Sequence, residues 1–190
     1  MQILFSLYHL LAATLERADR FLPVLARLLF AATLLFYFWS SGLTKLGDGV
    51  FGFMHPSAGA YAQIFPRAME AVTYDTGQLG LFHWAVVTFG TWAEFLLPLL
   101  IVTGLACRVA ALGMIGFIVV QSLTDLFGHG GLAHGALGAW FDKAPDALVL
   151  DQRAFWVFVL LVLAIKGAGP LSVDRWLSSR GAGRYVSSAA

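Results

Sequence analysis

Residues 81–105 read LFHWAVVTFGTWAEFLLPLLIVTGL, and Glu94 is the only Asp, Glu, Lys or Arg among them. A helix needs about 20 mainly apolar residues to cross the hydrocarbon core of a bilayer, so this stretch predicts a membrane-spanning helix. Residues 107–127 follow after almost no linker and carry Arg108 and Asp125 only near their ends. The two stretches together predict a tight antiparallel helical hairpin in the membrane.

Two further apolar stretches have the length of a membrane span. Residues 21–43 contain only Arg27, and residues 154–173 contain only Lys166 before Val173. Because lipid offers the backbone no hydrogen-bond partners, we expect helices at all four places. The sequence therefore predicts an all-α integral membrane protein with a four-helix bundle in residues 21–178. Residues 179–190 are expected to form a flexible cytoplasmic tail.

The composition excludes several other classes of protein. Hydrophobic residues make up 59% of the 190-residue chain and charged residues 12%, with a mean hydropathy of +0.77. Soluble domains have about 45 to 50% hydrophobic residues and about 25% charged residues, so a soluble bundle with charged outer faces is not expected. A net charge of +1 does not favour binding to nucleic acid. The single cysteine, Cys107, excludes an internal disulfide and a CxxC redox centre.

Residues 1–20 are amphipathic. Ile3, Leu4, Leu7, Leu11 and Leu15 recur at helical spacing, and no basic segment precedes them as it would in a signal peptide. We therefore expect an interfacial amphipathic helix that leads into the first span.

The positive charges predict the topology. With a cytoplasmic N-terminus and four spans, eight basic residues fall on the inner side and four on the outer side. This bias favours a multi-pass protein of a bacterial inner membrane with both termini in the cytoplasm. The inner group is Arg17, Arg20, Arg27, Arg108, Lys166, Arg175, Arg180 and Arg184, and the outer group is Lys45, Arg67, Lys143 and Arg153.

Glu94 is the strongest indication of function, because an ionisable group at the middle of a membrane helix usually faces the bundle interior. Arg27 lies at a depth from which its long side chain can reach Glu94, so a structural ion pair between helices is one interpretation. Pro98, four residues after Glu94, cannot donate to the carbonyl of residue 94 and leaves a free acceptor beside the acid. A proton relay or a site for a polar head group is the other interpretation.

Polar residues near the outer ends of the first and third spans extend this region. The run SSGLTK at residues 40–45 permits close helix approach, and Lys45 either reaches inward to an anion or carbonyl or extends to the interface. Gln121 and Asp125 are four residues apart and share one helix face. With Glu94 they would form a polar path from mid-membrane to the outer surface.

Histidines gather on the predicted outer side. His55, His83, His129 and His134 would provide a metal site there together with Asp125, or would simply be independent loop residues. Because no histidine lies deep in a span, haem is not expected.

Three short motifs resemble the DoxX family of small four-helix membrane proteins. They are SGLTKL at the end of the first span, Glu94 followed by GLACRVAAL, and KGAGPLSVDRWL, within a match over residues 20–178. The resemblance carries over Lys45, Glu94 and Arg108 as functional positions, with Arg27 as a fourth. The family is similar to the small membrane subunit of thiosulfate:quinone oxidoreductase, which implies quinone as a ligand and a periplasmic redox partner.

Three functions follow as hypotheses. The first is a quinone-interacting accessory subunit of an oxidoreductase, alone or as a homo-oligomer, in which Glu94 handles protons and Lys45 or Gln121 binds a quinone carbonyl. The second is handling of copper or zinc at the outer face through His129 and His134. The third is a non-catalytic structural or carrier protein in which Glu94 pairs with Arg27. In the first, four aromatic residues would surround the quinone ring, namely Phe36, Trp39, Phe89 and Trp92.

Overall fold

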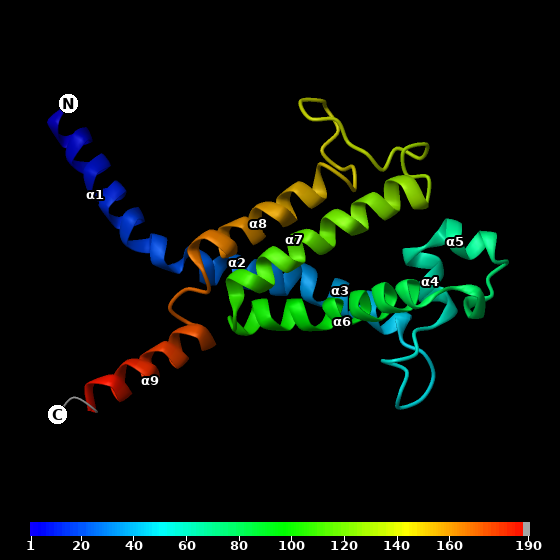
Figure 1. Cartoon of the computed structure of the whole chain (residues 1–190). Helices are drawn as coiled ribbons and strands as arrows, with labels where there is room; N and C mark the ends of the chain where they lie inside the picture. Colours follow the sequence, from blue (N-terminus) through cyan, green and yellow to red (C-terminus); the bar gives the residue numbers. More distant parts are fainter. Residues whose placement is uncertain (188–190) are drawn as a thin grey trace.

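A computed structural model describes residues 1–187, with side chains as far as Arg180. The chain begins with a long helical rod from Gln2 to Lys45, composed of α1 (Gln2–Ala18), a 3-10 turn (Asp19–Phe21), α2 (Leu22–Phe30), a π-helical turn (Ala31–Leu35) and α3 (Phe36–Lys45). None of the residues of α1 is buried. Figure 1 shows α1 and α9 (Val173–Ser187) extending from the same end of the packed helices.

The central hairpin has the form that the sequence predicts. Helix α6 (Leu81–Thr103) ends at Gly104 in the left-handed conformation, and α7 (Cys107–Leu123) begins after Ala106, which also has a positive φ of 48°. A π-helical turn, η4 (Thr124–Gly128), extends α7. Helices α6 and α7 pack against each other beside this turn and diverge toward their other ends (Figure 1).

The predicted fourth span, 154–173, is longer than the helix in the structure. Helix α8 (Gln152–Lys166) has 15 residues and packs against α7 and α2. It ends at Gly167, which has a φ of 81°, and Gly169 and Pro170 prevent it from resuming. Fifteen residues rise by about 22 Å, which is less than the roughly 30 Å of a bilayer core.

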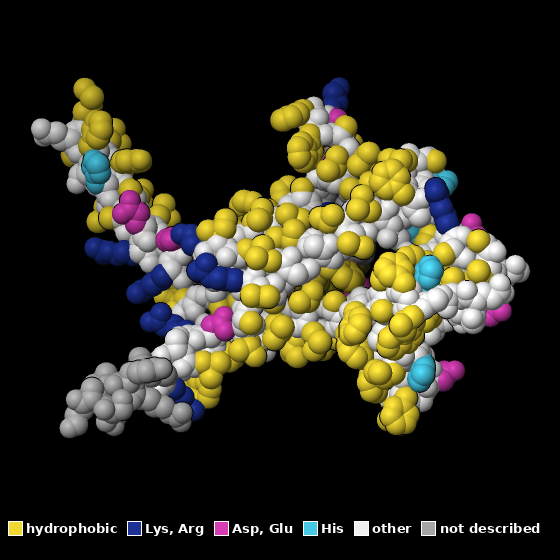
Figure 2. Space-filling view, in the orientation of Figure 1, with side chains coloured by type: hydrophobic (Ala, Val, Ile, Leu, Met, Phe, Trp, Pro, Cys, Tyr) yellow, Lys and Arg dark blue, Asp and Glu magenta, His cyan; other side chains and the backbone are white. Residues whose placement is uncertain are grey.

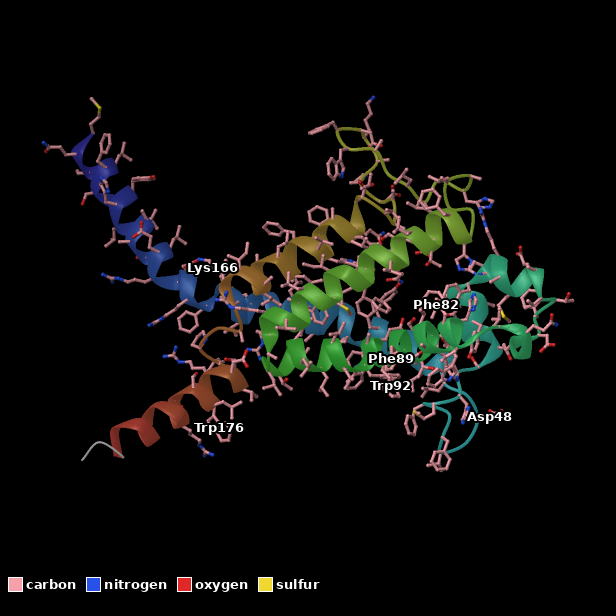
Figure 3. The ribbon with its side chains drawn as sticks, viewed as in Figure 1. Asp48, Phe82, Phe89, Trp92, Lys166 and Trp176 are labelled. Atoms are coloured by element: carbon pink, nitrogen blue, oxygen red, sulfur yellow. The ribbon has the colours of Figure 1, made fainter. Side chains whose placement is uncertain are left out.

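The long connection between the first two spans is partly helical. It contains α4 (Ala58–Ile64), α5 (Pro66–Ala71) and a 3-10 turn (Thr76–Gln78), and it begins with an irregular loop over residues 46–57. Trp84 and Trp92 hold this loop against α6, because their Nε1 atoms donate to the carbonyls of Met54 and Phe53 at 3.0 and 2.8 Å. Figure 3 shows Asp48 in the projecting loop and Trp92 beside it. Residues 129–151 form a second irregular segment.

The helices bury an apolar core and keep an apolar exterior. Phe30 and Phe38 of the rod, Ile101 of α6, Met114 of α7 and Leu160 of α8 are fully buried and belong to one cluster. Large hydrophobic side chains also cover the outer sides of these helices (Figure 2). Three helical segments are long and apolar enough to cross a membrane: Gln2–Lys45, Leu81–Thr103 and Cys107–Gly128. The chain is therefore a multi-pass membrane protein that is helical in its described residues.

The predicted tail is helical as far as it is described. Helix α9 covers residues 173–187, and residues 188–190 lie outside the described part of the chain.

Candidate functional site

A buried ion pair joins α3 to α6. Lys45 Nζ lies 3.0 Å from both carboxylate oxygens of Glu94, and the two residues are only 5% and 2% exposed. Ser41 completes the group: its Oγ accepts from Lys45 Nζ at 2.6 Å and donates to Glu94 Oε1 at 3.0 Å. Each charge is thus neutralised and hydrogen-bonded, which is the condition under which a buried charge is tolerated.

The small residues of the SSGLTK run let α3 approach α6 closely. A methyl group added at Gly42 would lie 2.7 Å from the Cε2 and Cζ atoms of the Phe95 ring. Trp39 adds a second contact, since its Nε1 donates to the Phe95 carbonyl at 3.2 Å. The absence of a side chain at residue 42 therefore positions Ser41 and Lys45 against Glu94.

We expect Gly42→Val to lower the free energy of unfolding by about 1 to 3 kcal/mol, because overpacking at Phe95 forces α3 and α6 apart. Denaturation by SDS in detergent micelles would measure this change. Gly116→Val in α7 is the matched control, because an added methyl group there has no neighbour within 4 Å. Equal losses of stability in the two variants would contradict the proposed close contact.

The ion pair borders a cavity of about 170 Å³ between α3, α4, α6 and α7, which we call the polar cavity for its charged and amide side chains, although apolar groups form most of its surface. The side chain of Gln121 contributes from α7: its Nε2 donates to the Tyr37 hydroxyl at 3.1 Å, while its buried Oε1 has no hydrogen-bond partner. An unpartnered buried acceptor indicates a missing donor, from water or from a ligand. The lining residues are Ser41, Lys45, Gln63, Ile64, Gly90, Glu94, Phe117, Val120, Gln121, Thr124, Asp125 and His129.

Asp125 reaches the cavity from the π-helical turn η4. Its carboxylate pairs with Nη2 of Arg153, and Nη1 of the same guanidinium donates to Ser122 Oγ at 2.9 Å. Arg153 is only 3% exposed, although it stands at the beginning of α8. Lys45 and Glu94 therefore both line the cavity, whereas Asp125 lines it and is paired with Arg153, which lies outside the lining.

Arg27 does not pair with Glu94, so the predicted Arg27–Glu94 bridge is wrong. Its guanidinium donates to four backbone carbonyls: those of Ile101 and Val102 at the end of α6, and those of Ala168 and Leu171 after α8. The last carbonyls of a helix have no partner within the helix, and a cation at that end is favoured. These carbonyls lie at the depth of Arg27, which explains why it binds them and leaves Glu94 to Lys45.

Three other predicted site residues lie away from the cavity. Arg108 is at the opposite end of α7, beside Gly167. Trp39 and Trp92 use their indole N–H groups on the backbone carbonyls of Phe95 and Phe53 and do not line the cavity. The ring of aromatic residues predicted around a quinone is therefore not the lining of the space beside Glu94. Figure 3 shows Phe89 and Trp92 on the side of α6 near the projecting loop.

The predicted metal ligands His129 and His134 belong to no cluster of three such side chains among the described residues. His129 lines the cavity, where its Nε2 donates to the Gln63 carbonyl at 2.9 Å, and His134 lies in the irregular segment beyond it. Within residues 1–187, no three His, Cys, Asp or Glu side chains gather as a metal site would require. Metal handling stays a prediction from the sequence.

Sequence reasoning missed the contribution of α4 and of Arg153. Gln63 and Ile64 close the cavity from a short helix in the outer connection, and their spacing gives no signal of this role. The pairing of Arg153 with Asp125 could have been predicted from the sequence. Arg153 stands at the start of an apolar run on the same predicted outer side as Asp125, and a charged group at such a place usually has a partner of opposite charge.

Comparison of the chain with protein-family models, with curated proteins and with solved structures finds no match.

Proposed function

We propose that this protein is an inner-membrane, DoxX-like four-helix protein with both termini in the cytoplasm, and that it binds the head group of a quinone beside Lys45 and Glu94. In this role it acts as an accessory subunit that links a periplasmic redox reaction to the quinone pool. The observation that carries the proposal is the buried Lys45–Ser41–Glu94 group at the edge of a polar cavity with an unpartnered Gln121 oxygen.

The polar groups of the cavity suit both redox forms of a quinone. An oxidised head group presents two carbonyl acceptors, and Lys45 and Ser41 can donate to them by giving up part of their hydrogen bonding to each other and to Glu94. A reduced head group presents two hydroxyl donors, for which the Gln121 Oε1 atom is an acceptor. When bound, a quinone supplies reversible acceptance of two electrons and two protons. Glu94 is the group that can hold a proton at the edge of the cavity, and a partner protein would supply the electrons.

A mainly apolar groove adjoins the cavity and suits the isoprenoid tail of a quinone. Ile64, Val120 and Thr124 line both the cavity and a neighbouring groove of about 540 Å³. The groove continues along Phe65, Pro66, Leu123 and Phe127, and Leu123 and Phe127 are about half exposed on the outer side of α7 and η4. A ligand with a polar head and an apolar tail would place its head in the cavity and its tail along the groove.

In the proposed bundle the rod, α6, α7 and α8 are the four crossing elements. Helix α8 is short for a span, and residues 167–172 would complete the crossing as an irregular segment whose Ala168 and Leu171 carbonyls are satisfied by Arg27. Non-helical backbone at membrane depth is tolerated when protein groups satisfy it in this way.

Filling the cavity tests the proposal without removing the ion pair. A methyl group added at Gly90 would lie 3.9 Å from Ile64 Cδ1, so an isoleucine there has room to extend into the cavity. We expect the wild-type protein to retain quinone through purification and Gly90→Ile to lose most of it, as measured by solvent extraction and mass spectrometry. Gly116→Ile, on an exposed face of α7, is expected to retain it.

Two results would overturn the proposal. One is a quinone content in the wild type no higher than in an unrelated four-helix membrane protein purified in the same way. The other is equal retention by Gly90→Ile and the wild type. Glu94→Gln, measured alongside with its thermal stability, separates the functions of the acid: lost quinone with a stable fold indicates a ligand site, whereas lost stability with unchanged quinone indicates a structural pair.

A further inference from the structure

A second cavity lies at the opposite end of the helices, where α1 and α9 diverge. It measures about 830 Å³ and is bounded by the junction of α1 and α2, the turn between α6 and α7, the end of α8 and the first turns of α9. Figure 2 shows Lys and Arg side chains gathered at this junction, and Figure 3 places Lys166 there.

The charges of this cavity do not balance. Arg20, Arg108, Lys166 and Arg175 line it, against Asp19 and Asp174, so that four positive groups face two negative ones. Lys166 Nζ pairs with Asp19 at 2.6 Å, which neutralises both groups.

Asp174 has a different partner. Its carboxylate oxygens accept from the backbone N–H groups of Ala106 and Cys107 at 2.8 and 3.2 Å, at the beginning of α7. Among the side chains that the structure describes, no carboxylate therefore lies within ion-pair distance of Arg20, Arg108 or Arg175. Three guanidinium groups remain available to an anion.

The local backbone holds one of these groups at the cavity wall. A methyl group added at Gly167 would lie 3.2 Å from Nε of Arg108, so the guanidinium rests directly over this glycine. Gly167, Ala168, Gly169 and Pro170 form the adjoining wall and carry no charge. The guanidinium of Arg108 therefore lies against an uncharged wall of the cavity formed by residues 167–170.

Apolar groups border the same space. Phe21, Pro23, Val109 and Pro170 line the cavity beside the arginines, at the level where apolar α2 and α7 begin. An anion that carries hydrocarbon chains matches this combination, because its charged part meets the guanidinium groups and its chains continue along the apolar helices. Guanidinium groups bind phosphate oxygens in pairs, and basic pockets between membrane helices bind phospholipid head groups.

We propose that this cavity is a binding site for the phosphate group of an anionic membrane phospholipid, with Arg108 and Arg175 as its main ligands and Arg20 at its rim. The site is separate from the quinone cavity and does not depend on the function proposed for it. It places an anionic phospholipid at the end of the molecule from which α1 and α9 extend.

Native mass spectrometry of the protein in detergent, titrated with phosphatidylglycerol or with phosphatidylcholine, tests the site. We expect phosphatidylglycerol to bind with a defined stoichiometry and phosphatidylcholine to bind more weakly. The double variant Arg108→Gln/Arg175→Gln is expected to weaken phosphatidylglycerol binding by about tenfold or more, because it removes both main guanidinium ligands of the phosphate. Both arginines are exposed, so the fold should persist, and a thermal melt checks this.

The matched control is Arg17→Gln/Arg180→Gln, which removes the same charge near the same end of the molecule but outside the cavity. Unchanged affinity in this control supports a localised site, whereas an equal loss in both double variants overturns it in favour of a general positive field. Inorganic phosphate is the probe for the alternative ligand. If it displaces phosphatidylglycerol at equal concentration, the lipid assignment is overturned and the site is one for free phosphate.

Discussion

Lys45→Met is expected to lower the free energy of unfolding by about 3 to 5 kcal/mol. The substitution leaves the Glu94 carboxyl, which is 2% exposed, without its cation in the packed interface between α3 and α6, so it must either stay ionised without a partner or take up a proton. Removing one partner of a buried pair costs more than the pair itself contributes, because the remaining charge keeps its desolvation penalty. SDS denaturation in detergent micelles, followed by circular dichroism, would measure the change.

The double variant Lys45→Met/Glu94→Leu is the decisive companion to this experiment. It replaces both charges by apolar groups, so most of the lost stability should return. Lys166→Met provides the matched comparison, because Lys166 forms a pair with Asp19 in which both side chains are about half exposed. Removal of that pair should change the unfolding free energy by at most about 1 kcal/mol. Similar losses for Lys45→Met and Lys166→Met would contradict the burial described here.

Arg27→Met is expected to have the second large effect, a loss of about 3 to 5 kcal/mol. Four backbone carbonyls lose a charged donor at once, and each hydrogen bond to a charged group contributes about 1.5 to 3 kcal/mol in a non-additive way. Because the carbonyls of Ala168 and Leu171 accept from Arg27 in the irregular segment after α8, that segment should also become more accessible. Limited proteolysis at residues 167–172 would detect it alongside the loss of stability.

Arg27→Lys separates charge from geometry in this contact. Lysine keeps the charge but has one nitrogen, so it cannot serve the end of α6 and the 167–172 segment with the forked geometry of a guanidinium. We expect it to recover only part of the stability. Arg17→Met in exposed α1 is the control and should have little effect. Full recovery by Arg27→Lys would show that charge at the end of α6, and not the fourfold hydrogen bonding, stabilises the structure.

The Arg27 contact and the Lys45–Glu94 contact differ in the elements that they join and in whether they border the cavity. The Arg27 contact joins the helical rod to α6 and to the segment after α8, and Arg27 does not line the cavity beside Glu94. The Lys45–Glu94 contact joins only α3 and α6 and opens onto the polar cavity. Mutations at Arg27 should therefore affect folding alone, whereas mutations at Gly90 or Gln121 should affect ligand binding with less change in stability.

Several features follow from local sequence alone. The single charge in residues 81–105 and the short linker before residue 107 determine the α6–α7 hairpin, because local apolar length is sufficient to define a span. The end of α8 is also encoded locally, by Gly167, Gly169 and Pro170. The apolar character of residues 167–173 outweighed that signal in the sequence-based prediction and extended the helix too far.

Only the tertiary structure decided the partners of the buried charges and the shape of the cavity. Sequence determined that Glu94 must be neutralised, since an unpaired charge inside a membrane helix is costly, and that Gln121 and Asp125 share one helix face; it did not determine that this face meets Glu94. It did not determine whether Lys45 or Arg27 neutralises Glu94. That choice depends on where the carbonyls at the end of α6 and in residues 167–172 that accept from Arg27 lie in space, and these positions are set by helix packing between segments far apart in the chain.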